Sequence, residues 1–172
     1  EKEIREITES VDIETEVFVH GALCMCYSGQ CYMSGFIGRR SGNRGLCAQP
    51  CRLPYRVDGS KKETYPLSLK DLCLAGNLSV LRDMGVSSLK IEGRMKRPEY
   101  VAAAVSACRH AADGEKAPQT LLDDLGAVFS RSGFTDGYLS AKRGRDMFGI
   151  RTKEDVEVAS SAVFASLHEL YK

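Results

Sequence analysis

Apolar and polar positions alternate along Val11–His20, and this alternation predicts a half-buried β-strand. The segment Ser87–Glu92 is rich in apolar and hydroxyl side chains and predicts a second strand. Elsewhere apolar side chains recur at helical spacing, as Ile4 and Ile7 do near the start of the chain. The helices expected on this basis cover Lys2–Glu9, Leu69–Leu74, Ser79–Met84, Glu99–Ala112, Ala117–Phe129 and Lys153–Tyr171.

Turn and cap residues mark the boundaries of these elements. Asp58-Gly59 predicts a hairpin turn between Arg52–Val57 and Lys62–Leu67. Ser68 is positioned to cap the helix that follows the hairpin. Two later segments complete the pattern, a helix opened by Pro98 and a glycine- and arginine-rich loop over Ser132–Gly149.

Apolar stripes predict which helix faces are buried. The expected buried face of the helix over Glu99–Ala112 consists of Val101, Ala104, Val105 and Cys108. The expected buried face of the final helix consists of Val156, Ala159, Val163, Leu167 and Leu170.

The order of helices and strands predicts an α/β fold with parallel strands. Both strands run into polar, glycine-rich loops, and in parallel barrels the functional side chains lie at these carboxyl ends. The candidate catalytic residues are His20, Glu92 and Arg94. The alternative is that these three are hydrogen-bonded structural residues around a site. Two strands do not make a stable sheet, so others lie either in the irregular segments or in a preceding sequence, and we expect the second.

Composition indicates an ordinary globular protein. Its 172 residues suit about one domain, and a net charge of +1 gives no overall basic signal. The sequence contains no apolar run long enough to span a membrane and no recognisable signal peptide, so we expect a cytoplasmic protein without a membrane partner. The first residue is not Met, which fits a piece of a longer protein.

Cysteine is the most unusual feature of the composition, with seven residues in the chain. A cluster between Glu16 and Tyr55 contains Cys24, Cys26, Cys31, Cys47 and Cys51. In a reducing cytosol, clustered thiols bind metal or carry out redox chemistry. Their spacing differs from that of a zinc ribbon, which favours an iron–sulfur cluster over zinc and over inert buried thiols. Cys26 is expected to point away from Cys24, and Cys108 to lie in the core.

Arginines accompany the cysteines in the same stretch. Arg39, Arg40, Arg44 and Arg52 lie among glycines, and such a loop can present guanidinium and backbone N–H groups to phosphate. RNA is the partner that this interpretation favours, and the alternative is a basic loop exposed to solvent.

Four blocks of the sequence resemble, in order, a known family. They are EVFVHGALCMCYSGQCYMS, SLKDLC, GVSSLKIEGRMKRPEYV and SGFTDGYLS, and they resemble the collagenase-like peptidase family U32, whose catalytic type is unknown. The stretch RSGNRGLCAQPCRLPY is most similar to the large members, among them ribosomal RNA cytidine hydroxylases.

The resemblance implies the later part of a TIM-type barrel over residues 1–114, with a Cys/Arg-rich insertion over 21–67 and a helical and loop extension over 115–172. Relatives include tRNA and rRNA hydroxylation proteins and an oxygen-independent ubiquinone hydroxylase pair with a 4Fe-4S cluster. Matching the blocks residue by residue places the cluster ligands at Cys24, Cys31, Cys47 and Cys73, with Cys51 as the alternative fourth ligand.

The resemblance also implies an activity. RNA-hydroxylating relatives take prephenate as the hydroxyl source, so the expected function is iron–sulfur-dependent, oxygen-independent hydroxylation of an RNA base. The rival function is a collagenase-like endopeptidase that acts on a protein substrate. A further alternative is that this piece alone is inactive, because it holds only part of a barrel. An incomplete barrel also exposes strand edges, which homo-oligomerisation would cover.

Overall fold

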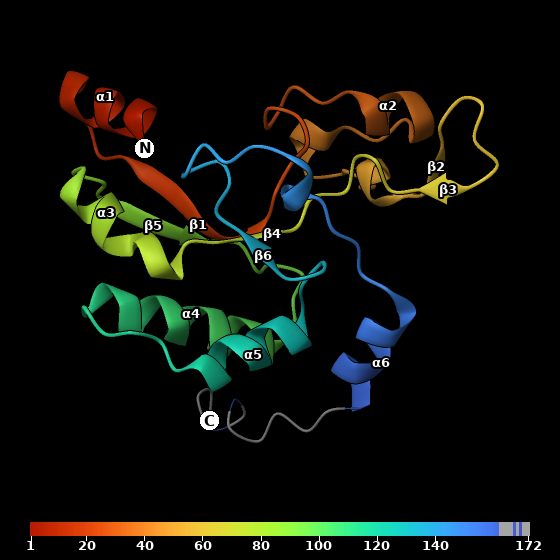
Figure 1. The fold of residues 1–172 in the computed structure, drawn as a ribbon. Coiled ribbons are helices and arrows are strands. Elements are labelled where there is room, and N and C mark those ends of the chain that lie inside the picture. Colours follow the sequence, from red (N-terminus) through yellow and green to blue (C-terminus); the bar gives the residue numbers. More distant parts are fainter. Residues whose placement is uncertain (162–166, 168, 170–172) are drawn as a thin grey trace.

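The computed structural model describes residues 1–161, 167 and 169, which form a main sheet, helices packed on it and a lobe beside it (Figure 1). The helices are α1 (Lys2–Ser10), α2 (Met33–Gly38), α3 (Leu78–Asp83), α4 (Pro98–Ala112), α5 (Gln119–Val128) and α6 (Lys153–Ser161). The strands are β1 (Glu16–Ala22), β2 (Tyr55–Arg56), β3 (Glu63–Thr64), β4 (Asp71–Cys73), β5 (Ser88–Ile91) and β6 (Phe134–Thr135). Short 3₁₀ helices connect them: η1 (Gly42–Arg44), η2 (Pro50–Arg52), η3 (Ala75–Asn77) and η4 (Arg145–Met147).

The main sheet has the strand order β5-β1-β4-β6 and mixed strand directions. β1 runs parallel to β5 but antiparallel to β4, and β4 runs parallel to β6. The predicted α/β class is therefore confirmed, whereas the expectation of parallel strands throughout is wrong at the β1–β4 pair. Additional strands do lie in segments expected to be irregular or helical, because β4 and β6 complete this sheet. A TIM-type barrel stays a prediction.

The helix expected over Leu69–Leu74 is wrong, because this segment contains the strand β4. Ser68 caps no helix, and its hydroxyl donates to the carbonyl oxygen of Gly149 at 2.7 Å. The amide of Leu74 donates to the carbonyl oxygen of Val19 on β1 at 2.8 Å. A strand buried on both faces shows no alternation of apolar and polar residues, so its pattern resembles one turn of a buried helix. The buried residues of the segment are Leu69, Asp71, Leu72 and Leu74.

The other long elements lie close to their predicted positions. The predicted strands over Val11–His20 and Ser87–Glu92 are β1 and β5, although β1 starts only at Glu16. The predicted helices that are confirmed correspond to α1, α3, α4 and α5.

Two clusters of buried side chains hold the helices on the sheet. The first joins β1 and β4 to α3 and α4, and it includes Val19, Leu72 and Leu81. The second joins α4 to α5 and includes Tyr100 and Leu125. The predicted division of the chain between residues 114 and 115 falls between these two packed helices, and it stays a prediction.

The buried face of α4 differs from the predicted one. Ala104 and Cys108 are buried as expected, but Val101 and Val105 are 40% and 49% exposed. Alanines carry a weak hydrophobic signal, yet their small side chains let a helix approach its neighbours closely, so they replace the valines in the packed face. The buried residues of α4 are Tyr100, Ala103, Ala104, Ala107 and Cys108.

The final predicted helix is only partly comparable with the structure. α6 covers Lys153–Ser161, where Ala159 is buried as predicted and Val156 is exposed. Leu167 is buried as predicted, whereas Val163 and Leu170 lie outside the described residues. In the described part of the chain, no helix is both long enough and apolar enough to cross a membrane.

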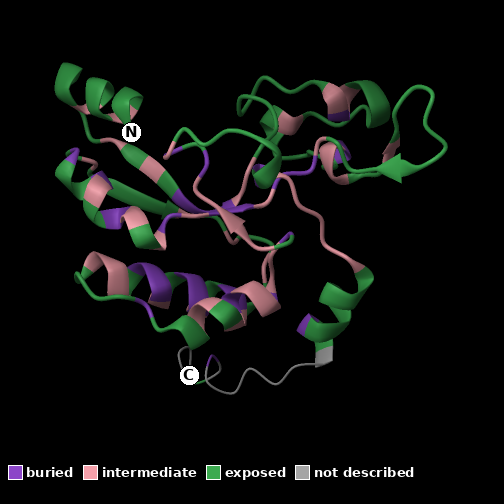
Figure 2. Ribbon diagram, viewed as in Figure 1, coloured by how far each residue is buried: buried purple, intermediate pink, exposed green. Residues whose placement is uncertain are grey.

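Residues 23–67 form the lobe beside the sheet, which we call the cysteine lobe and which is mostly exposed (Figure 2). It contains α2, η1, η2 and the predicted hairpin, which is confirmed as the antiparallel pair of β2 and β3. Gly59 has a φ of 76° in the hairpin turn, a conformation that glycine adopts without strain. The buried residues of the lobe are Ser34 and Pro50, so it has little hydrophobic core of its own.

Candidate functional site

Four cysteines of the lobe lie within electrostatic reach of one another near the end of β1. Burial raises the pKa of Cys24, and charges on Cys51 and Cys47 raise it further. Burial also raises the pKa of Cys51, where Arg52 opposes the rise and Cys47 and Cys31 add to it. Such effects require neighbouring groups, so Cys51 lies near Cys24, Cys31 and Cys47.

Local contacts position two of these cysteines. The amide of Gln49 donates to Cys47 Sγ at 3.3 Å. A methyl group at Gly42 would lie 3.7 Å from the carbonyl oxygen of Cys31 and 3.8 Å from Cys47 Cβ, so the two cysteines flank this glycine. A donor set of thiols suits an iron–sulfur cluster or zinc. Among residues 1–161, 167 and 169, no three His, Cys, Asp or Glu side chains are arranged to hold a metal ion, so metal binding by these thiols would require their side chains to rearrange.

Cys73, the predicted fourth ligand, lies on β4 and not in the lobe. It pairs with His20 across β1 and β4, so the two side chains share one face of the sheet. Burial raises the pKa of Cys73. Burial and then a charge on Cys73 raise the pKa of Cys108 on α4 to about 11, which places Cys73 near this helix. Cys51 therefore lies near the other lobe cysteines, whereas Cys73 lies near α4, and the ligand set stays a prediction. Cys26 is exposed, as are Cys24, Cys31 and Cys47.

His20, a predicted catalytic residue, is a buried side chain that is 1% exposed. Its ring lies 5.3 Å from that of Tyr100 and 5.4 Å from that of Phe134, measured between centroids. Burial, together with the positive charge of Lys96, lowers the pKa of His20 to about 4, so the ring is neutral at pH 7. Its Nε2 is buried without a hydrogen-bond partner among the described residues. These surroundings suit a packing role better than proton exchange with a substrate.

Glu92 and Arg94, the other predicted catalytic residues, are exposed in the loop after β5. The amide of Glu92 donates to the carbonyl oxygen of His20 at 2.9 Å, so the two predicted residues are neighbours through the backbone. The guanidinium of Arg94 lies 3.9 Å from the position of a Cβ at Gly45 in the cysteine lobe. Both side chains therefore lie at the carboxyl end of β5, on the side where the lobe lies.

The four predicted phosphate-binding arginines divide into two kinds. Arg39, Arg40 and Arg44 are exposed on the lobe. Arg52 is partly buried, and it donates to the carbonyl oxygens of Leu23 and Leu69, each at 2.5 Å, and to Ser68 Oγ at 3.3 Å. Arg52 thus connects the lobe to the segment that enters β4.

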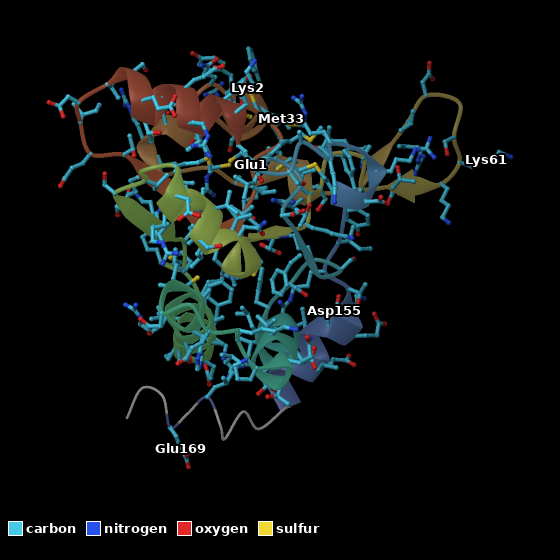
Figure 3. All side chains as sticks on the ribbon, turned by 60° about the vertical axis from the view of Figure 1, so that its left-hand side comes forward. Glu1, Lys2, Met33, Lys61, Asp155 and Glu169 are labelled. Carbon is cyan, nitrogen blue, oxygen red and sulfur yellow. The ribbon has the colours of Figure 1, made fainter. Side chains whose placement is uncertain are left out.

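A pocket of ≈ 370 Å³ lies where the lobe meets the loops of the sheet. In Figure 3, Met33 and Lys61 of the lobe lie above Asp155 of α6. Four of the described residues that line the pocket are cations, and none is acidic: Arg52, Lys96, Arg131 and Arg151. Behind it, Arg131 Nη1 donates to Asp71 Oδ1 at 2.5 Å in a buried ion pair.

The profile of Peptidase family U32 matches residues 1–148 of the chain. The chain belongs to peptidase family U32. The resemblance that the four sequence blocks carry is thereby confirmed. No solved structure matches this U32 chain.

Curated relatives of this U32 chain carry names of two kinds. A tRNA hydroxylation protein P1 of Bacillus subtilis is 44% identical over 64% of this chain and 29% of the relative. A 23S rRNA 5-hydroxycytidine synthase of Escherichia coli is 48% identical over 58% of this chain and 16% of the relative. A collagenase of Porphyromonas gingivalis is 38% identical over 76% of this chain and 39% of the relative. The U32 chain thus spans less than half the length of each of these relatives.

Sequence reasoning missed most of the basic pocket of this U32 chain. Lys96, Arg131 and Arg151 come from three separate loops, and no local motif relates them. One signal was present, because Asp71 is an acid among leucines and a buried acid requires a cationic partner. The helix predicted over Leu69–Leu74 does not bury Asp71, so the need for a cationic partner is not evident from that prediction.

Proposed function

We propose that this chain is part of an enzyme that hydroxylates a base in RNA. The proposal rests on the relatives at 44% and 48% identity, which are named for tRNA hydroxylation and for the synthesis of 5-hydroxycytidine in 23S rRNA. The four thiols near the end of β1 support it, because they offer a place for a redox group beside an exposed substrate-accessible lobe.

The redox group in this proposal is a 4Fe-4S cluster held by Cys24, Cys31, Cys47 and Cys51. The mutual effects of these cysteines on their pKa values support Cys51 over Cys73 as the fourth ligand. When bound, the cluster would supply one-electron chemistry without oxygen. Zinc is less favoured because the cysteine spacing is irregular, and prephenate is the proposed hydroxyl donor on the resemblance alone.

The protein's own residues then hold and orient the RNA. Arg39, Arg40 and Arg44 are exposed on the cysteine lobe, where they can contact backbone phosphates. Glu92 and Arg94 remain candidate catalytic residues beside the reacting base, because both are exposed at the carboxyl end of β5. His20 has no catalytic role in this proposal, because its neutral ring is buried against aromatic side chains.

The test compares RNA nucleosides by mass spectrometry in a strain that lacks the gene and in strains that carry variants. We expect one hydroxylated nucleoside to be lost on deletion and restored by the wild type and by Cys108→Ser, a buried thiol outside the lobe. Cys31→Ser should not restore it, because a lost thiolate ligand prevents cluster binding. An unchanged set of hydroxylated nucleosides after deletion contradicts the proposal.

An endopeptidase is the alternative function, and the collagenase relative at 38% identity over 76% of this chain favours it. This function predicts that purified protein cleaves gelatin, and that deletion abolishes the cleavage while RNA hydroxylation persists. Cleavage that survives Cys31→Ser, together with unchanged nucleosides, would favour the peptidase.

A further inference from the structure

The basic pocket combines a concave shape with an excess of positive charge. Its ≈ 370 Å³ lie within the range of small-molecule sites. The four cations reach it from separate parts of the chain: Arg52 from η2, Lys96 from the loop after β5, Arg131 from the loop before β6 and Arg151 from the segment before α6. Convergence from four segments indicates a site that the fold builds, rather than a charged patch on one helix face.

The acid behind the pocket, Asp71, does not by itself balance the four cations. Asp71 is 1% exposed and forms its ion pair with Arg131, whose side chain is 9% exposed. Arg52 donates to three oxygen atoms of the surrounding segments, none of which carries a charge. Burial and then the charge of Arg131 lower the pKa of Lys96 to about 8, as expected where cations crowd one another.

Two of the cations retain hydrogen-bonding capacity for a ligand. Arg151 Nη2 donates to the carbonyl oxygen of Val128 at 3.2 Å, but its Nη1 is buried with no partner among the described residues. Lys96 Nζ lies 2.8 Å from the centroid of the Phe129 ring and forms no ion pair with any described residue. A buried donor without a partner costs free energy, and an anion that Arg151 Nη1 turned to meet would remove that cost.

We propose that this pocket binds a phosphate group. Three guanidinium groups and one ammonium group from four separate segments line it, and so many donors suit the four oxygen atoms of phosphate better than the two of a carboxylate. Phosphate can come from a small phosphorylated molecule or from the RNA backbone. The second source rests on the proposed function, whereas the first is independent of it.

Titration calorimetry of the purified protein with inorganic phosphate tests the site directly. We expect saturable binding that Lys96→Gln and Arg151→Gln each weaken by about tenfold, the effect of losing one charge-assisted hydrogen bond. Arg82→Gln is the matched control, because this arginine is exposed on α3 and lies outside the pocket. Equal affinity in the wild type and both pocket variants overturns the proposal, and so does displacement by malonate as effective as that by phosphate.

A second titration with a short RNA at several salt concentrations separates the two sources. If the RNA backbone occupies the pocket, each pocket variant reduces the magnitude of the slope of log K against log salt by about 1, the value for one lost phosphate contact. If a small phosphorylated molecule occupies it, the variants weaken phosphate binding and this slope is unchanged. Absence of both effects overturns the proposal. Neither titration measures hydroxylation, so failure here and failure of the proposed function remain distinguishable.

Discussion

At the residue scale, the ion pair of Asp71 with Arg131 connects β4 to the loop before β6. The atoms Arg131 Nη1 and Asp71 Oδ1 are 2.5 Å apart, and both side chains are buried. Removing one partner of a buried pair leaves an uncompensated charge, so we expect Arg131→Met to lower the free energy of unfolding by about 3–5 kcal/mol. Urea denaturation measures this loss. The exposed pair of Arg109 and Asp113 is the control, and Arg109→Met should leave the midpoint unchanged.

A second residue-scale prediction concerns His20, whose pKa burial lowers to about 4 from its ordinary value of 6.5. Above pH 6.5 the ring is neutral in both states, and the full stability is present. As the pH falls from 6.5 to 4, the unfolded chain binds a proton that the folded protein does not, so stability falls by about 3 kcal/mol. His20→Gln should remove this part of the fall in urea midpoints measured between pH 7 and 4.

The control for this titration is His110→Gln, on α4, where the histidine is partly exposed and contacts Glu115. This variant should retain the fall that His20 causes. If the His20→Gln variant loses stability towards acid as steeply as the wild type, then the buried neutral ring is not responsible.

At the element scale, the sequence pattern identifies elements that have one polar face or a clear terminal residue. Pro98 marks the start of α4, and Gly85, with a φ of 80°, directly follows the predicted helix over Ser79–Met84. β4 was missed because it is buried on both faces, and β6 because two residues carry no periodicity. The face of α4 was misread because its valines are more hydrophobic than the alanines that pack.

Gly21, within β1, carries an element-scale prediction. Its φ is 137°, and a Cβ there would lie 2.6 Å from Glu92 Cβ in the loop after β5. Gly21→Ala therefore combines backbone strain with a close contact to another strand connection. Gly114 is the matched control, because its φ of 83° is also positive but no atom lies within 4 Å of its added Cβ. We expect Gly21→Ala to lose about 1–3 kcal/mol more than Gly114→Ala in urea denaturation. Similar losses would show that the contact is unimportant.

At the scale of the whole molecule, the two parts of the candidate site differ in how far the sequence reveals them. The cysteine lobe is visible because its thiols are close together in the chain, so local composition indicates shared chemistry. The basic pocket assembles Arg52, Lys96, Arg131 and Arg151 across about a hundred residues of sequence. The pairing of β5 with β1, of β1 with β4 and of β4 with β6, together with the attachment of the lobe, brings these cations together, and none of these follows from a local pattern.

The lobe and the sheet should also differ in what stabilises them. The sheet and its helices share two buried clusters, whereas Ser34 and Pro50 are the buried residues of the lobe. A segment with so little buried surface gains order mainly from its ligands, and metal binding is then coupled to folding. We expect anaerobic reconstitution with iron and sulfide to slow amide hydrogen exchange over residues 23–56 and to leave exchange in α4 unchanged.

Two variants decide which thiols produce this protection. Cys51→Ser should abolish the slowing in the lobe, because Cys51 lies within reach of Cys24, Cys31 and Cys47. Cys73→Ser should retain it, because Cys73 faces α4 and Cys108. The opposite result, protection lost with Cys73→Ser and kept with Cys51→Ser, would mean that β4 and the lobe move together on binding. Protection that appears with zinc alone, and not with iron and sulfide, would replace the cluster by a zinc site and remove the redox basis of the proposed function.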